Sequence, residues 1–258
     1  MLSSIDELNL MSSLYSNFQI TQIKQDNKKD YTLIYAFIAA LLLDYNIVEE
    51  KLNMVTAQKA YEIRKANELI NEVFSKQIKT ETKKVTEILK DSLQKLENFR
   101  NKQTSNVWKV SNKDVQKILN ATIEGKNYSD RIYDNKNKVA KLLKKLIKDF
   151  VDGKISANDI KTIIQKKFNT NDFDTNRLVE NEISRVCREL DEQYFKDNIN
   201  DIDELVYNGV LDSRICEHCF KLDGTTYKVN DVNRPKTPAH VSCRCFYSIK
   251  YKKKVEVK

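Results

Sequence analysis

Glycine and proline are nearly absent from this chain of 258 residues, which contains four glycines and two prolines. Compact β folds need these residues in their many turns, so their scarcity favours a chain built mainly of long helices. The stretch 44–101 contains neither residue, and its apolar side chains recur at helical spacing. We therefore predict one or two long amphipathic helices there, packed as an elongated hairpin or a coiled coil.

Shorter helices are predicted before this stretch. A capping-box pattern at 4–7 opens a helix that runs to about residue 19, and a polar loop follows at 22–30. The apolar run 31–43 predicts a helix that protein covers on all sides. A membrane-spanning helix needs about 20 apolar residues, so this run is too short and no membrane contact is predicted.

More helices are predicted after the long one. A break at 101–112 precedes a helix that Ser111 or Asn112 caps, that runs through Ile123, and that Gly125 ends. A basic helix follows, and Gly153 ends it. Two further helices are expected, one opened near residue 156 and one capped by Asp174, with Cys187 on the core face of the second.

The basic helix carries most of the excess charge. Residues 131–168 contain one Arg, ten Lys and four Asp, which gives this segment a net charge of +7. The net charge of the whole chain is +8. This face is either a solvated surface or a contact for nucleic acid or another acidic partner. No aromatic residues interleave with the lysines, so any DNA contact would be non-specific and directed at phosphates. The candidate lysines are Lys138, Lys141, Lys144, Lys145 and Lys148.

Cysteine and histidine gather in one segment, 212–245, which holds four of the five cysteines and both histidines. Thiolate sulfur and imidazole nitrogen suit a tetrahedral Zn²⁺ ion. The spacing Cys-x-x-Cys is followed later by His-x-x-Cys and one more cysteine. The candidate ligands are Cys216, Cys219, His240, Cys243 and Cys245. We favour the first four in a closed, structural site, with Cys245 as a substitute and His218 pointing outward.

Two other states of these cysteines are open, a disulfide-bonded one and a reduced, metal-free one. The N-terminal residues show no secretory signal pattern, so we expect a reducing compartment, which favours metal over disulfides.

Strands are predicted at 205–211, 225–229 and 246–251, and we expect the Cys/His cluster to hold together the loops of this three-stranded sheet. The fold class is therefore mainly α, with an elongated helical region at 1–125 and a small α+β domain at 126–258.

The Cys/His segment resembles the phage Mu F-type minor head proteins, also called head morphogenesis proteins of tailed phages. The shared pattern is Asp-x-Arg-x-Cys-x-x-Cys, then Leu-Asp-Gly, then Pro-x-His-x-x-Cys-Arg-Cys. The resemblance covers about residues 155–250, and Glu182 alone fits the Arg-Thr-Glu triplet that the family usually has upstream. The matching residues are Asp212, Arg214, Cys216, Cys219, Leu222, Asp223, Gly224, Pro238, His240, Cys243, Arg244 and Cys245.

The resemblance implies a minor component of the phage capsid, associated with the portal vertex and with head assembly. The implied partners are the portal protein, the major capsid and scaffolding proteins, and packaged DNA through non-specific contacts. We therefore expect the protein to be present in the phage head in multiple copies. Its assembly into the head is expected to take place in the host cytoplasm. The long amphipathic helices suit such a role because they offer large apolar stripes for partners.

Two other classes of function are weighed against this one. We predict no enzyme, because five candidate ligands suffice to close the metal site and no zinc-deaminase, phosphate-loop or Gly-x-Ser-x-Gly pattern occurs. The alternative is a zinc-containing, DNA-binding regulatory protein, which the positive charge supports. The ligand order differs from a two-Cys, two-His finger, and no recognition helix lies between the ligand pairs.

Overall fold

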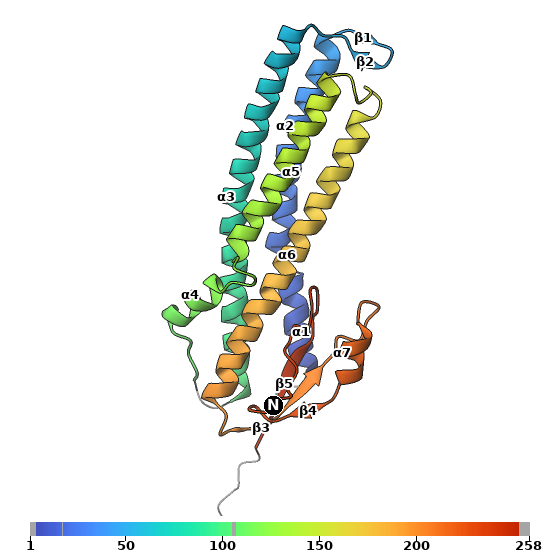
Figure 1. Ribbon diagram of the computed structural model, residues 1–258. Helices are drawn as coiled ribbons and strands as arrows, with labels where there is room; N and C mark the ends of the chain where they lie inside the picture. The colour runs from blue at the N-terminus through green and yellow to red at the C-terminus, as the bar shows by residue number, and fades with distance from the viewer. Residues whose placement is uncertain (1–3, 17, 105–106, 253–258) are drawn as a thin grey trace, which may run out of the picture. The chain divides into compact units, whose positions relative to one another are not determined.

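The computed structural model describes residues 4–16, 18–104 and 107–252, which are mainly helical (Figure 1). The helices are α1 (Ser4–Tyr15), α2 (Phe18–Asp44), α3 (Thr56–Gln103), α4 (Asn112–Asn120), α5 (Tyr128–Val151), α6 (Ile160–Asp197) and α7 (Glu217–Leu222). The strands are β1 (Ile47–Val48), β2 (Lys51–Leu52), β3 (Ile202–Asn208), β4 (Thr226–Tyr227) and β5 (Phe246–Tyr251). The predicted fold class, long helices followed by a small three-stranded sheet beside a Cys/His cluster, is confirmed.

Contacts divide the chain into two compact units. Unit 1 consists of Met1–Asn17, Thr86–Ala121 and Val179–Lys258, and unit 2 consists of Phe18–Val85 and Thr122–Leu178. Helices α3 and α6 each supply residues to both units. The compact units therefore do not follow the boundary near residue 125 that the sequence led us to expect. A single cut in the chain cannot separate them, because each unit is assembled from segments that are distant in sequence.

Unit 2 is a bundle of α2, α5 and the parts of α3 and α6 that belong to it (Figure 1). The backbone N–H of Ala157 donates to the carbonyl of Glu50 at 2.8 Å, so the α5–α6 connection contacts the β1–β2 hairpin that joins α2 to α3. Buried side chains from all four helices share one core, which includes Ile34, Ile38, Ile70, Phe74, Leu143, Ile147, Ile164 and Phe168. The stretch 44–101, predicted to form one or two long helices in a hairpin or coiled coil, contributes the single long helix α3, which packs with α2, α5 and α6 in a four-helix bundle.

The β1–β2 hairpin was not predicted, and its turn shows why. Glu49 and Glu50 occupy the turn with φ angles of 46° and 62°, in the left-handed region that glycine or asparagine normally fills. Without such a residue, the sequence contains no turn signal. The hydrogen bond from the Ala157 N–H to the Glu50 carbonyl helps to hold the turn in this conformation.

Helix α2 corrects two predictions. The expected polar loop at 22–30 is helical, because Ile23, Asn27 and Asp30 share a buried face although two of them are polar. The expectation that residues 31–43 are covered on all sides is also wrong. Ile34 and Ile38 are buried, whereas Leu43 is 86% exposed. In the described part of the chain, no helix combines the length and apolar character that a bilayer crossing requires.

Helix α6 is continuous where two helices were predicted. Asp174, the expected cap of the second helix, lies within α6, and its neighbours Asn171 and Thr175 are buried in the bundle. There Lys136 of α5 is fully buried, with its Nζ 2.8 Å from Glu81 Oε2, 3.5 Å from Asn171 Oδ1 and 3.4 Å from Thr175 Oγ1. A buried charge must be paired and hydrogen-bonded. Glu81, Asn171 and Thr175 provide these contacts to Lys136, and α6 continues without a break.

Two of the predicted signals at the ends of the shorter helices are confirmed, and one is wrong. The Ser111 side chain caps α4 by accepting from the Asp114 N–H, and Gly153 follows α5 with a φ of 76°. Helix α4 ends at Asn120, before the predicted Ile123. Gly125 instead lies in a tight turn in which the backbones of Ile123 and Lys126 exchange hydrogen bonds.

Unit 1 contains the antiparallel sheet, in the order β4-β3-β5. Leu205 of β3 lies opposite Tyr227 of β4 and Ile249 of β5. One face of the sheet packs on the end of α6, with Tyr194, Phe195, Leu205, Tyr207 and Tyr247 in the core. The three predicted strands are present, with β3 beginning three residues earlier than expected and β4 shorter.

A buried ion network joins three helices of unit 1. Arg100 of α3 is fully buried and pairs with Glu7 of α1 through Nη2 and, at 2.8 Å, with Asp191 of α6 through Nε. Burial raises the pKa of Glu7 to about 7, and it also raises the pKa of Asp191. The α+β region therefore includes the first helix and part of α3, and residues 126–258 do not form it alone.

Candidate metal centre

Helix α7 positions the first pair of predicted ligands. Cys216 is its N-cap residue, and its Sγ accepts from the backbone N–H of Cys219 at 3.4 Å. The Cys-x-x-Cys spacing places both sulfurs on the same side of the first turn. Cys219 is buried, whereas the intervening His218 is exposed, as predicted.

The second group of predicted ligands lies on the segment that enters β5. His240 Nε2 is 3.1 Å from Cys216 Sγ and 3.6 Å from Cys219 Sγ, and Cys219 Sγ is 3.7 Å from Cys243 Sγ. Cys216, Cys219 and His240 form one group with donor atoms within 4.8 Å, and Cys219, Cys243 and Cys245 form a second. The five predicted ligands therefore lie in two overlapping groups, each of which could hold a metal ion, with Cys219 common to both.

The histidine turns its Nε2 atom toward the sulfurs. His240 Nδ1 is 2.9 Å from the carbonyl of Val241, and a carbonyl can only accept, so Nδ1 carries the proton and Nε2 faces the cysteines. This hydrogen bond raises the pKa of His240. A backbone acceptor on the far nitrogen is the usual way in which proteins orient a metal-binding imidazole.

The thiols differ in how readily they ionise. The Cys245 thiol donates to Cys243 and lowers the pKa of Cys243 to about 5, while the Cys219 N–H lowers the pKa of Cys216. Burial raises the pKa of Cys219 to about 11. A cation that binds here would displace the protons that the thiols still hold.

Two contacts that the sequence did not reveal support the cluster. The hydroxyl of Tyr207, a fully buried residue of β3, donates to Cys219 Sγ at 3.4 Å. Arg244 Nη2 lies 2.6 and 2.7 Å from the two carboxylate oxygens of Asp212, and it ties the segment before Cys216 to the one that carries Cys243. Asp212 and Arg244 were visible as motif residues, but nothing in their spacing indicated that they pair.

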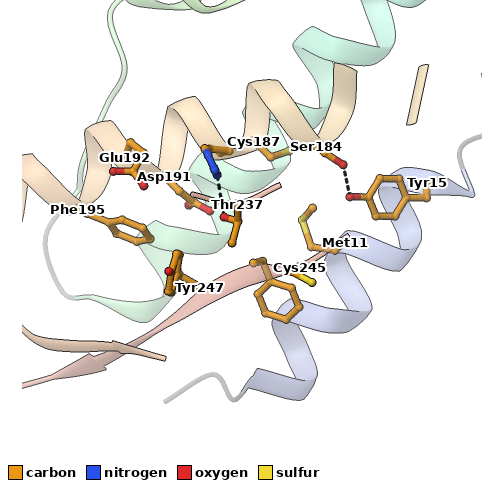
Figure 2. A pocket seen from close by; sticks show the side chains of 12 residues that line it. Met11, Tyr15, Ser184, Cys187, Asp191, Glu192, Phe195, Thr237, Cys245 and Tyr247 are labelled. Atoms are coloured by element: carbon orange, nitrogen blue, oxygen red, sulfur yellow. Dashed lines mark hydrogen bonds between the residues drawn. The ribbon is translucent and has the colours of Figure 1, made fainter. Parts of the chain in front are cut away.

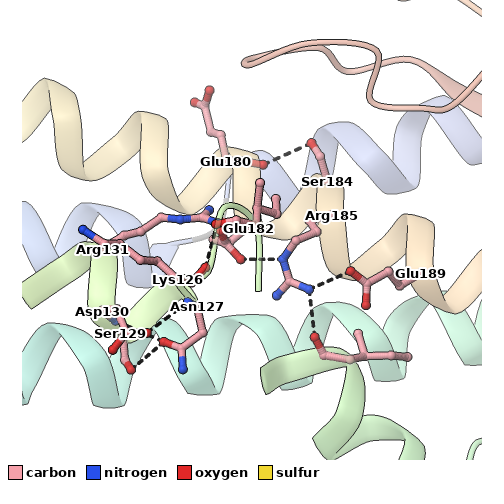
Figure 3. Close-up of polar contacts among 12 residues, drawn as sticks. Lys126, Asn127, Ser129, Asp130, Arg131, Glu180, Glu182, Ser184, Arg185 and Glu189 are labelled. Atoms are coloured by element: carbon pink, nitrogen blue, oxygen red, sulfur yellow. Dashed lines mark hydrogen bonds and ion pairs between the residues drawn. The ribbon is translucent and has the colours of Figure 1, made fainter. Parts of the chain in front are cut away.

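Helix α6 anchors the second ligand segment. The side chain of Asn181 accepts from the N–H of Ser242 at 2.7 Å, and Ser184 Oγ donates to the carbonyl of Cys243 at 3.5 Å. Glu182, the only residue that matches the upstream triplet, is buried and accepts from Arg185 Nε at 2.7 Å (Figure 3). Arg185 in turn donates to the carbonyl of Ile118 at the end of α4.

The spaces around the cluster are water-sized. A cavity of about 20 Å³ lies between α1, α6 and β5, beside Cys187 and Cys245, and is bordered by the Tyr15–Ser184 hydrogen bond of 2.7 Å (Figure 2). A second cavity of about 10 Å³ lies against Cys216 and His240 themselves. Such volumes hold about one water molecule each. Cys187 is buried in the core of unit 1, as predicted.

The predicted basic face lies on α5 in unit 2. Lys138, Lys141, Lys145 and Lys148 are exposed, and Lys144 is half-buried with its Nζ 2.6 Å from Asn71 Oδ1. Lys148 pairs with Asp152. Unit 2 contains 24 Lys and Arg against 17 Asp and Glu, so it holds nearly all of the chain's net charge of +8. The exposed lysines of α5 carry the part of this positive charge that is accessible to a partner.

No protein-family model, curated protein or solved structure matches this chain. The chemistry of the cluster is therefore inferred from its own donor atoms and distances. The likeness of segment 212–245 to the Mu F-type proteins stays an expectation from the motif residues.

Proposed function

We propose that this protein is a minor capsid and head morphogenesis protein of a tailed phage, associated with the portal vertex. The observation that carries the proposal is the convergence of the two halves of the motif. Asp212 and Arg244, which flank the ligand pairs in sequence, form an ion pair beside the five clustered Cys and His residues. The residues behind the resemblance to the Mu F-type proteins thus build one local site, which supports a shared structural role.

Within this proposal the cluster binds one structural Zn²⁺ ion. Zinc lies about 2.3 Å from thiolate and about 2.0–2.1 Å from imidazole, so a tetrahedral site has S–S edges of about 3.8 Å and S–N edges of about 3.5 Å. The Cys219–Cys243 and Cys219–His240 distances of 3.7 and 3.6 Å fit these edges. Cys216, Cys219, His240 and Cys243 would then be the ligands, with Cys245 and Tyr207 as outer supports.

Four protein ligands leave no position for a reacting water, so we propose a role in folding and not in catalysis. The water-sized cavities beside the cluster agree with this reading, because a substrate needs a far larger space. The bundle of unit 2 would supply the contacts with portal, capsid and scaffolding proteins. Exposed apolar side chains near its hairpin, such as Leu43, Val48 and Val55, are available for them.

The capsid proposal predicts that the protein is a component of purified virions. Quantitative mass spectrometry should find it at a fixed number of copies per portal ring, and antibody labelling in electron micrographs should mark one vertex of the head. Co-expression with the portal protein encoded in the same genome should yield a complex. Absence from virions, together with no complex with the portal protein, would contradict the proposal.

A second prediction concerns contact with packaged DNA through the basic face. Replacing the exposed Lys138, Lys141 and Lys145 with alanine should weaken binding to duplex DNA equally for all sequences. Each lost phosphate contact should also reduce the slope of log K against log salt by about 1. Fluorescence anisotropy at several salt concentrations measures both effects. The matched control replaces three exposed lysines of unit 1, Lys95, Lys117 and Lys221, and should change neither.

The same experiment tests the alternative function, a zinc-containing DNA-binding regulator, which the charge concentrated in unit 2 favours. A regulator must prefer its own site over other sequences by a large factor. Binding that persists at high salt, or that depends strongly on sequence, would favour the regulator over the capsid protein.

A further inference from the structure

The Cys/His cluster contains one more donor than a zinc ion needs. Four ligands complete a tetrahedral site, and the proposed ones are Cys216, Cys219, His240 and Cys243. Cys245 is left over, although its Sγ lies within 4.8 Å of both Cys219 Sγ and Cys243 Sγ. A structural site of four ligands does not require a fifth sulfur at this distance.

The position of Cys245 makes Cys243 its natural partner. The two residues lie on the segment that enters β5, with Arg244 between them. Two steps along an extended chain span at most about 6.6–7.2 Å, and disulfides join Cα atoms about 4.4–6.8 Å apart, so a small local adjustment suffices. Cys219 instead belongs to α7, where the Tyr207 hydroxyl holds its sulfur at 3.4 Å.

A small oxidant can reach this pair of thiols. Cys245 is partly exposed, whereas Cys219 and Cys243 are 1% and 4% exposed. Cys245 also borders both water-sized cavities, one on the side of α1 and α6 (Figure 2) and one that Cys243 shares. Hydrogen peroxide is little larger than water, so both sulfurs are accessible to it through these spaces.

We propose that Cys243 and Cys245 form an oxidation site, at which a hydroperoxide converts the two thiol groups to a disulfide and so releases the zinc ion. The release rests on the structural zinc site proposed above. The disulfide itself forms with or without the ion, so the two proposals can fail separately.

The reaction proceeds in two steps. Cys243, a thiolate when it is a zinc ligand, attacks one peroxide oxygen; the O–O bond breaks, a sulfenic acid forms, and the hydroxide that leaves becomes water with a proton from solvent. The Cys245 sulfur then attacks the Cys243 sulfur, the S–O bond breaks, and the second hydroxide leaves as water with the Cys245 proton. Two electrons pass from the sulfurs to the peroxide, and the ion keeps only three protein ligands.

Digestion with trypsin reveals the disulfide, because Arg244 lies between the two cysteines. After hydrogen peroxide treatment of the full-length protein, blocking of the remaining thiols and digestion, mass spectrometry should find peptides 237–244 and 245–250 linked. Dithiothreitol should separate them, since a disulfide is reversible and a sulfinic acid is not. Purified protein without zinc would contradict the zinc site, whereas linkage of these peptides would still support the oxidation site.

Zinc release, followed with a chromogenic chelator, should accompany the disulfide. Cys245→Ser keeps the four proposed ligands but has no second thiol, so peroxide should release its bound zinc at least tenfold more slowly. The matched control Cys187→Ala removes a buried thiol that borders the same cavity as Cys245, and it should release zinc at the unaltered rate.

The proposal is overturned if peroxide leaves Cys243 and Cys245 unlinked, or if Cys245→Ser releases zinc as fast as the unaltered protein. A disulfide from either cysteine to Cys219 or Cys187 would overturn it as well.

Discussion

Replacing Cys219 with serine should abolish stoichiometric zinc binding and destabilise unit 1 by several kcal/mol. Cys219 is the ligand common to both clustered groups, and it is the buried one of its pair. Zinc binding to small domains is worth roughly 10–16 kcal/mol of folding free energy, so losing even part of it exceeds the effect of most single substitutions. Tyr207 would also lose the sulfur acceptor of its buried hydroxyl.

The measurements are zinc per chain by mass spectrometry and the free energy of unfolding with and without chelator. The unaltered protein should contain close to one zinc and should lose stability when chelator is added, whereas the variant should be insensitive to chelator. Cys187→Ala, which removes a buried thiol outside both groups, should keep the zinc. An unaltered protein that contains no metal and stays equally stable in chelator would leave the cluster as metal-free thiols.

Replacing Arg100 with methionine should destabilise unit 1 by about 3–5 kcal/mol or more. Methionine fills similar space, but the carboxylates of Glu7 and Asp191 would stay buried without a cation. Removing one partner of a single buried ion pair costs roughly 3–5 kcal/mol, and here two partners lose their charge compensation. Urea unfolding followed by circular dichroism measures the loss. Arg177→Met, which breaks an exposed ion pair with Asp174, should change stability little.

The pH dependence of this variant identifies the cause. Burial raises the pKa of Glu7 from 4.5 to about 7 in the folded protein. Its contribution to stability is therefore complete below pH 4.5 and is lost as the pH rises through about 7. Without Arg100 the folded-state pKa rises further, so the variant continues to lose stability above pH 7. Its deficit should be larger at pH 8 than at pH 5.

A rescue separates this explanation from simple loss of packing. The triple variant with Arg100→Met, Glu7→Gln and Asp191→Asn carries no buried charge at this position, and it should recover much of the lost stability. A deficit that is independent of pH and that the triple variant does not reduce would mean that packing, and not uncompensated charge, dominates at Arg100.

The local features of this protein could be predicted because each depends on nearby residues. The scarcity of glycine and proline and the helical spacing of apolar side chains in 44–101 predicted long helices, and α3 is one of them. The Cys-x-x-Cys and His-x-x-Cys spacings selected five residues that the structure brings together. Each helix and each ligand pair depends on residues within a few positions, whereas the approach of the two pairs joins residues 24 positions apart and needed the tertiary structure.

Tertiary packing decided what depends on distant residues. Polarity at 22–30 predicted a loop and Asp174 predicted a new helix start, yet both segments lie inside continuous helices. Asp26 and Asp30 pair with Lys84 and Lys76 of α3, and Asn171 and Thr175 contact the buried Lys136 of α5. Glu7 had the pattern of a cap, but its pairing with Arg100 joins residues 93 positions apart and places α1 in the unit with the sheet. A buried charge is stable only beside its partner, and no pattern along the chain indicates which distant residue that partner is.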